Sequence, residues 1–385
     1  MFDIIEKQIN VDLPLDHHLH CMISQIPNHL GQADFSCRLA DPEQKWAELK
    51  SILQLIADGD GNLKKCHFLV LPEAAVPAAY VDEALKFIET EFRANTITAF
   101  GVDHIPLSQY RQFLERYPDD NAEVLESVKR DLDAGDIDEI PTNWAITAIK
   151  EADGRLRVFM QAKSHPFVGE EQLDSLHDLY RGKVFPLFRC QPNCFNFMSL
   201  ICLDYVYRDL YQSNITVIIE HANQLFFRSR QRLDLLLVLE CNPKPEHPAF
   251  RDVVNGFYGE YLAYTPGVKD TITVFCNSSE ETSGLPKGEN MSFGHSAVVI
   301  HKSHKMSPAS SPEYQADDFA GLPVCRLRFG TATRLYYFNL PMFHELDPRT
   351  TRVPMKIHGI FEQRATSWRR LEDERNNGHN SEIQH

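Results

Sequence analysis

Three reactive side chains, a carboxylate, an ammonium and a thiol, each follow or end an apolar run of the β type. Glu73 comes directly after one buried-type run, Lys163 comes after the second strand of a hairpin, and Cys202 ends the central apolar run of the chain. Residues at equivalent ends of neighbouring strands can converge on one cleft although they are far apart in sequence. There the carboxylate can take the proton of the thiol, and the ammonium can favour the thiolate. These residue types therefore predict a covalent acyl-transfer site, in which Lys163 and the backbone N–H of Leu203 stabilise the oxyanion.

Strands and helices alternate in the part of the chain that must position Glu73. Apolar runs at 19–26, 68–71 and 96–102 are typical of buried strands, and helical spacing over 42–56 and 81–92 separates them. Asp41 followed by Pro42 is a helix start signal, with an acidic N-cap and proline in the first turn. The β-α-β-α-β order predicts a layered α/β domain.

Later elements must position Lys163 and Cys202. An Asp-Gly turn at 153–154 between two apolar runs predicts a hairpin that ends shortly before Lys163. Beyond Cys202 we expect a short β-type run at 215–219, a helix at 247–264 and a loop at 304–320. Further strands are expected at 235–239, 271–276, 296–300 and 335–340.

The chain is predicted to form one elaborated domain over residues 1–350. Two stretches, 104–141 and 205–232, interrupt the core rhythm, and we interpret them as surface insertions; the first is acidic and has helical spacing. Residues 351–385 form a C-terminal extension, and its charged end is expected to be disordered.

Several motifs in this order resemble the nitrilase, or carbon–nitrogen hydrolase, superfamily. They are Leu71-Pro72-Glu73, the hairpin that leads to Lys163, and Ile201-Cys202-Leu203-Asp204. Asn143-Trp144-Ala145 is similar to the start of the family hairpin, and 293–300 is similar to a late Gly-x-Ser strand of the family. The resemblance covers roughly residues 18–302, except for the two insertions.

The resemblance implies an α-β-β-α sandwich in which Glu73 is the general base, Lys163 stabilises the oxyanion and Cys202 is the nucleophile. It implies hydrolysis of a non-peptide C–N bond through a thioester, with no metal or organic cofactor, and an amidohydrolase rather than a nitrilase. Family members usually carry another glutamate after the lysine. Glu170 is the favoured candidate because Gly169 permits a close backbone turn, and Glu171 is the alternative.

Composition narrows the class of partner. The chain has 385 residues, 43% of them hydrophobic, and a formal net charge of −15. A strongly acidic chain disfavours nucleic acid and anionic membrane surfaces as partners. No apolar run approaches the roughly 20 residues of a membrane helix, and the start does not read as a signal peptide. Nine cysteines, an odd number, favour reduced thiols in the cytoplasm. We therefore expect a cytoplasmic homodimer or larger assembly that acts on a small amide-like substrate.

Other interpretations stay open at this point. The protein could be a scaffold that binds a partner and has weak or no activity, or an acyltransferase that uses the same triad. A metal site at Cys190 and Cys194, or at His18 and His20, is disfavoured because neither pair has a clear further ligand.

Overall fold

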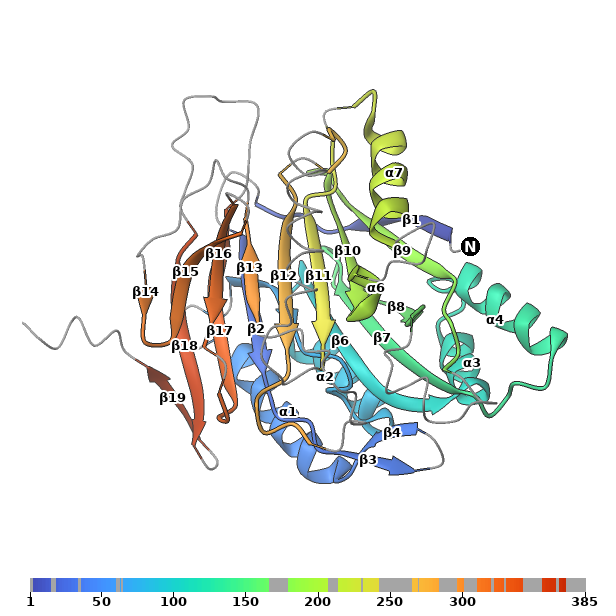
Figure 1. Ribbon diagram of the computed structural model, residues 1–385, viewed down its shortest axis with the longest axis horizontal. Coiled ribbons are helices and arrows are strands. Elements are labelled where there is room, and N and C mark those ends of the chain that lie inside the picture. Colours follow the sequence, from blue (N-terminus) through green and yellow to red (C-terminus); the bar gives the residue numbers. More distant parts are fainter. Residues whose placement is uncertain are drawn as a thin grey trace, which may run out of the picture.

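The computed structural model describes residues 3–14, 19–33, 36–59, 63, 65–165, 179–206, 214–229, 231–241, 265–268, 270–283, 296–300, 310–319, 322–328, 330–341, 355–364 and 367–371. Two large sheets and several helices form its framework, as the predicted α/β class requires (Figure 1). None of the helices within these ranges is long and apolar enough to cross a membrane.

The first large sheet has eight strands in the order β19-β18-β17-β2-β5-β6-β7-β8. Its central strands β2, β5 and β6 are parallel, while β7 and β8 continue the sheet as an antiparallel hairpin. The strands span Leu19–Gln25 (β2), Cys66–Val70 (β5), Thr96–Pro106 (β6), Pro141–Lys150 (β7), Leu156–Ala162 (β8), Arg334–Leu340 (β17), Ile357–Arg364 (β18) and Ser367–Leu371 (β19).

The second large sheet has nine strands in the order β1-β9-β10-β11-β12-β13-β16-β15-β14. Its centre is parallel from β10 to β12. The strands span Asp3–Asn10 (β1), Val184–Gln191 (β9), Phe195–Ile201 (β10), Leu235–Glu240 (β11), Ile272–Asn277 (β12), Ala297–Val299 (β13), Ser310–Ser311 (β14), Tyr314–Phe319 (β15) and Leu322–Leu327 (β16). A separate hairpin joins β3 (Leu30–Ala33) to β4 (Ser36–Leu39).

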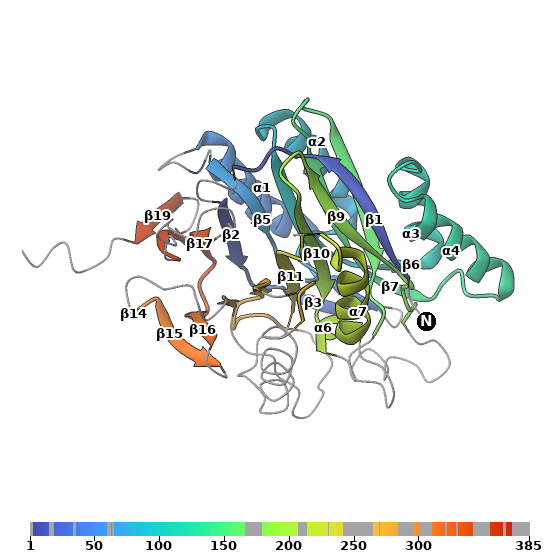
Figure 2. The ribbon, with the colours of Figure 1, turned by 90° about the horizontal axis from the view of Figure 1, so that it is seen from above.

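The two sheets pack face to face, with helices on their outer faces (Figure 2). Phe68 of β5 meets Phe197 of β10 edge-on at 5.7 Å between ring centroids, and Thr147 Oγ1 lies 3.0 Å from Ser199 Oγ across the same interface. The side chain of Leu69 lies on the opposite face of β5 from Phe68 and packs with the first two helices. Both faces of β5 are therefore buried, which explains its continuous apolar sequence.

The first helix begins at a residue whose side chain caps its free backbone groups. In α1 (Pro42–Asp58), the Asp41 side chain accepts a hydrogen bond from Gln44 N at 2.9 Å, and Gly59 ends the helix with φ of 68°. This confirms the predicted helix start. The remaining helices are η2 (Ala78–Tyr80), α2 (Val81–Glu91), α3 (Leu107–Arg116), α4 (Ala122–Ala134), α6 (Leu203–Val206) and α7 (Asn214–Phe226).

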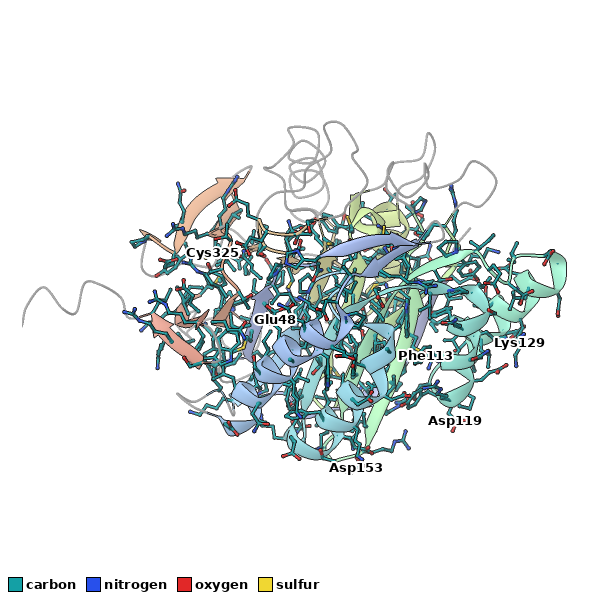
Figure 3. The ribbon with its side chains drawn as sticks, turned by 90° about the horizontal axis from the view of Figure 1, so that it is seen from below. Glu48, Phe113, Asp119, Lys129, Asp153 and Cys325 are labelled. Carbon is teal, nitrogen blue, oxygen red and sulfur yellow. The ribbon has the colours of Figure 1, made fainter. Side chains whose placement is uncertain are left out.

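The first predicted insertion contains α3 and α4, as its helical spacing indicates. Figure 3 labels Phe113 of α3 and Lys129 of α4 at one end of the molecule, opposite Cys325. The strands on both sides of it are longer than expected. β6 continues to Pro106, and β7 already begins at Pro141. Tyr110 is fully buried and meets Trp144 of β7 with 5.5 Å between ring centroids, so α3 is anchored on the sheet.

Two expectations about the second half of the chain were wrong. Residues 215–219 belong to the helix α7, because Ile215, Ile218, Ala222 and Phe226 form one buried face at helical spacing. Residues 304–320 are not a loop throughout, since 310–319 form a hairpin that extends the second sheet. The β3–β4 hairpin and five further strands, β1, β9, β16, β18 and β19, were not predicted. The helix expected at 247–264 lies outside the described residues.

Candidate active site

Glu73 lies just beyond β5, on a short segment that is pinned to β6. Gly101 N donates to Pro72 O at 3.0 Å, and Gly101 O accepts from Ala75 N and Val76 N, each at 3.0 Å. A Cβ at Gly101 would stand 2.4 Å from Glu73 Cα, so only glycine allows this approach. The close backbone contact at Gly101 therefore fixes the position of the segment that carries Glu73 after the end of β5.

The Glu73 carboxylate is almost completely buried and has three hydrogen-bond donors. Its Oε1 accepts from Lys163 Nζ at 2.8 Å and from Asn143 Nδ2 at 2.7 Å, and its Oε2 accepts from Cys241 N at 3.1 Å. The backbone oxygen of Glu73 also accepts from Asn28 Nδ2 at 2.9 Å. These contacts hold the carboxylate in one orientation.

Lys163 follows β8 and is 1% exposed. Its N–H donates to Asn143 O at 2.8 Å, and its carbonyl accepts from Gly182 N at 2.9 Å. A Cβ at Gly182 would meet Ala162 O at 2.1 Å, so a second glycine permits a close backbone contact next to the site. A buried ammonium needs a paired anion to offset its desolvation, and Glu73 provides it.

Cys202 occupies a sharp turn between β10 and α6. Its φ is 45°, in the left-handed region that non-glycine residues rarely adopt, and its side chain is 6% exposed. Cys202 N donates to Leu239 O at 2.8 Å, and Cys202 O accepts from Tyr205 N at 3.1 Å. A strained strand-to-helix turn is one way in which a fold holds a nucleophile away from its strand.

Asp204 connects the Cys202 turn to the lysine segment. It is fully buried, and its Oδ1 accepts from Ser164 N and Ser164 Oγ at 2.9 Å each and from His165 N at 3.1 Å. Burial raises the pKa of Asp204 to about 7, while the Lys163 charge and the hydrogen bonds from Ser164 and His165 act in the opposite direction.

The structure brings together the segments that carry the three predicted residues. Glu73 and Lys163 are in direct contact. The backbone N–H of Cys202 donates to Leu239 O. Two residues after Leu239, the backbone N–H of Cys241 donates to Glu73 Oε2. Glu170 and Glu171, the candidates for a second carboxylate, lie outside the described residues, so their roles stay predictions.

Several residues of this network were not singled out for a role by sequence reasoning. Asn28, Asn143, Glu240 and Cys241 all belong to it or border it. Glu240 could have been noticed, because it ends the apolar run 235–239 much as Glu73 ends its own run. Burial and the Glu73 charge raise the pKa of the Cys241 thiol to about 12, which keeps this neighbouring cysteine protonated.

The disfavoured metal sites gain no support. Within the part of the chain that the structure describes, no group of three or more His, Cys, Asp or Glu could hold a metal ion. Cys190 is fully buried in the core, whereas Cys194 is partly exposed and lies at φ of 55°. His20 stacks on Tyr337, and His18 lies outside the described residues.

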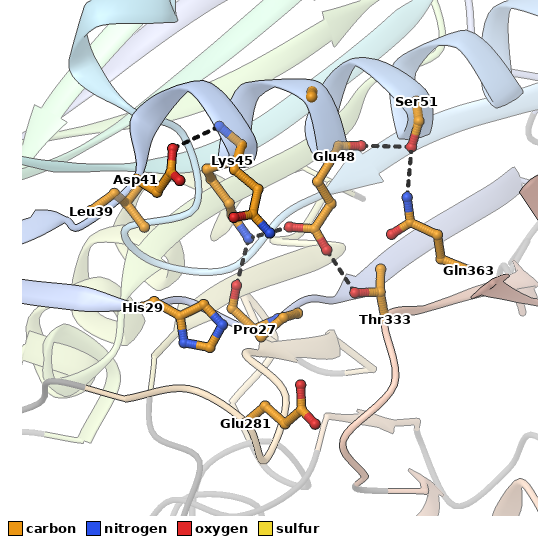
Figure 4. A pocket seen from close by; sticks show the side chains of 12 residues that line it. Pro27, His29, Leu39, Asp41, Lys45, Glu48, Ser51, Glu281, Thr333 and Gln363 are labelled. Atoms are coloured by element: carbon orange, nitrogen blue, oxygen red, sulfur yellow. Dashed lines mark hydrogen bonds and ion pairs between the residues drawn. The ribbon is translucent and has the colours of Figure 1, made fainter. Parts of the chain in front are cut away.

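A pocket of about 530 Å³ lies next to α1 and contains none of the three predicted residues (Figure 4). Among its lining groups are Lys45, Glu48, Glu281 and Thr333. Lys45 is bonded to Glu48 at 2.9 Å and to Pro27 O at 2.6 Å, and Glu48 accepts from Thr333 Oγ1 at 2.6 Å. The Lys45 and Glu48 side chains on the wall of this pocket thus form hydrogen bonds with neighbouring protein groups.

No protein-family model matches the chain, and no curated protein matches it.

Proposed function

We propose that this protein is a thiol-dependent hydrolase of a non-peptide C–N bond, with Cys202 as its nucleophile. The observation that supports this most is the buried Glu73–Lys163 pair, held by Asn143 and Cys241 N beside the strained Cys202 turn. The helix–sheet–sheet–helix layers are consistent with the α-β-β-α sandwich of the nitrilase superfamily, which we propose as the fold family.

In the proposed acylation, Glu73 takes the proton of the Cys202 thiol as the sulfur attacks the carbonyl carbon. The developing oxyanion is stabilised by Lys163 Nζ and by the N–H of Leu203. Glu73 then gives the proton to the nitrogen, the C–N bond breaks, and ammonia or an amine leaves a thioester on Cys202.

Hydrolysis completes the cycle with the same groups. Glu73 takes a proton from water, whose oxygen attacks the thioester carbon. The C–S bond breaks, and the proton returns to the sulfur, so the carboxylic acid leaves and the thiol is restored. The second carboxylate, Glu170 or Glu171, would position the lysine and the substrate. No step calls for a metal or an organic cofactor.

A screen of amides, ureas, carbamoyl compounds and nitriles tests this proposal. We expect one class to be hydrolysed, and mass spectrometry of the quenched enzyme to show an acyl group on Cys202 that hydroxylamine removes. Turnover of an acyl group to hydroxylamine or another amine in preference to water would identify an acyltransferase. A protein that binds a partner but acylates with no compound would favour the scaffold alternative. The cytoplasmic location and the homodimer or larger assembly stay predictions.

A further inference from the structure

Glu240 is a second buried glutamate that ends β11 inside the hydrogen-bond network of the site. The residue before it, Leu239, accepts the hydrogen bond from Cys202 N at 2.8 Å. The residue after it, Cys241, donates its N–H to Glu73 Oε2 at 3.1 Å. Glu240 therefore lies between the two contacts that connect the proposed nucleophile and the proposed base.

The side chain of Glu240 has an unusual environment for a carboxyl group. It is 1% exposed, and its Oε2 has no hydrogen-bond partner among the described residues. No cation within those ranges forms an ion pair with it, although Lys163 compensates Glu73 nearby. A buried carboxylate without a donor or a cation is strongly disfavoured, whereas the protonated acid is not.

Among the described residues, the charged group that acts on Glu240 is Glu73. Burial and the charge of Glu73 raise the pKa of Glu240 well above its ordinary value. Cys276 of β12 and Cys241 are also close, and burial raises the pKa of both thiols. Burial without a cation or a donor therefore favours the protonated form of Glu240, and a protonated carboxyl group is a hydrogen-bond donor.

We propose that Glu240 is a substrate-binding residue that acts as a neutral acid and donates its O–H to an uncharged acceptor atom of the substrate. This proposal rests on the proposed function and deepens it. The acceptor is the second oxygen or nitrogen of an amide-like or ureido-like compound. A substrate carboxylate is disfavoured, because the carboxyl groups of Glu73 and Asp204 already lie near the Lys163 ammonium.

Loss of the Glu240 proton would turn the donor into a repulsive charge. A carboxylate at this position would oppose both the Cys202 thiolate and the oxyanion that forms on attack. The reactivity of Cys202 should therefore fall, relative to that of an ordinary thiol, as the pH rises through the pKa of Glu240.

Two alkylating probes of similar size test this inference. Iodoacetamide is an uncharged amide and iodoacetate is a carboxylate, and both react with thiolates. The rate constant for alkylation of Cys202 is measured by mass spectrometry from pH 6 to pH 10. It is divided by the rate constant for the partly exposed Cys194 of the same molecule, which gives a reactivity ratio for each probe. The variants are Glu240→Gln, which keeps a donor but cannot ionise, and Glu240→Met, which has neither property. Glu151→Gln, a change at a buried carboxyl that accepts from Asn10 N, is the matched control.

We expect the wild-type ratio for iodoacetamide to exceed that for iodoacetate by about tenfold at pH 7, and Glu240→Met to lower the iodoacetamide ratio by about tenfold. Glu240→Gln should react at least about threefold faster than Glu240→Met and should lack the alkaline decline. Glu151→Gln should behave like the wild type.

An alkaline decline that persists in Glu240→Gln, or equal ratios in Glu240→Gln and Glu240→Met, would overturn the role of Glu240. The Glu240→Gln profile decides alone if Glu240→Met does not fold. Failure of the proposed function looks different, because Cys202 of the wild-type protein would then react no faster than Cys194 with either probe.

Discussion

Two lysine–glutamate pairs in this protein, one fully and one partly buried, have nearly the same N–O distance and very different surroundings. Lys163 and Glu73 are joined at 2.8 Å, and Lys45 and Glu48 are joined at 2.9 Å. The first pair joins residues 90 positions apart, from segments that follow two strands of one sheet, whereas the second lies within a single helix at a spacing of three.

The surroundings decide what each pair can do. Glu73 is also held by Asn143 and Cys241 N, and the strained Cys202 turn lies beside this network. Lys45 donates to Pro27 O and Glu48 accepts from Thr333 Oγ1, on the wall of a pocket whose described lining residues include no cysteine. Burial lowers the pKa of Lys45, while Glu48 and then Cys241 oppose that change. We expect this pair to have a structural role. A lysine–glutamate contact is thus not a catalytic sign unless a nucleophile accompanies it.

The largest effect should come from removing Cys202, the proposed nucleophile that distinguishes the first pair. Cys202→Ala should lower turnover by on the order of 10⁴-fold or more while the fold persists. The measurement is the steady-state rate on the substrate that the screen identifies, together with circular dichroism. Cys194→Ser, a change at a partly exposed thiol, is the control. Turnover retained in Cys202→Ala would remove the distinction between the two pairs.

Matched substitutions in the two pairs should have effects on the rate of thioester formation that differ by orders of magnitude. Glu73→Gln and Lys163→Met should each slow thioester formation by about 10²–10³-fold, because they remove the proposed base and the proposed oxyanion stabiliser. Glu48→Gln and Lys45→Met change the same chemical groups and should leave that rate within about threefold. Single-turnover mass spectrometry measures the rate. Equal losses in both pairs would mean that stability, and not catalysis, explains the effect.

The glycine that supports Glu73 offers a more indirect test. Gly101→Ala places a Cβ against Glu73 Cα, so the segment must shift, at a cost of about 1–3 kcal/mol of stability and with a large loss of activity. Gly330→Ala, where a Cβ would meet nothing within 4 Å, should change neither quantity appreciably. Urea unfolding and turnover measure the two effects. Full activity in Gly101→Ala would show that the position of Glu73 is not critical.

A final effect, on stability and dependent on pH, concerns Glu240, whose carboxyl Oε2 has no hydrogen-bond partner among the described residues. Since burial raises the folded-state pKa of Glu240 above the unfolded value of about 4.3, the folded state binds more protons, and stability falls as the pH rises above that value. Glu240→Gln should remove this loss. Its stability relative to the wild type should grow by about 1.4 kcal/mol per pH unit between about pH 5 and the folded-state pKa. A pH-independent difference in urea unfolding would mean that Glu240 is ionised in the folded protein.

Local patterns identified most of the elements around the site, and their failures have physical causes. The Asp-Gly turn between two apolar runs correctly indicated the β7–β8 hairpin. The run at 215–219 misled because Ile and Val favour strands, although the wider spacing up to Phe226 fits a buried helical face. β1 went unnoticed because it is an edge strand with few buried side chains, so its apolar signal is weak.

By itself, the sequence determined that Glu73, Lys163 and Cys202 follow or end buried runs, because strand ends are marked by a change from apolar to reactive residues within a few positions. Only the tertiary structure decided that Glu73 meets Lys163 and that Asn143 and Cys241 hold the carboxylate. It also decided that Glu240 has no cation within the described residues. Such contacts depend on the register between strands and on the packing of two sheets, and these long-range relations leave no trace in local spacing.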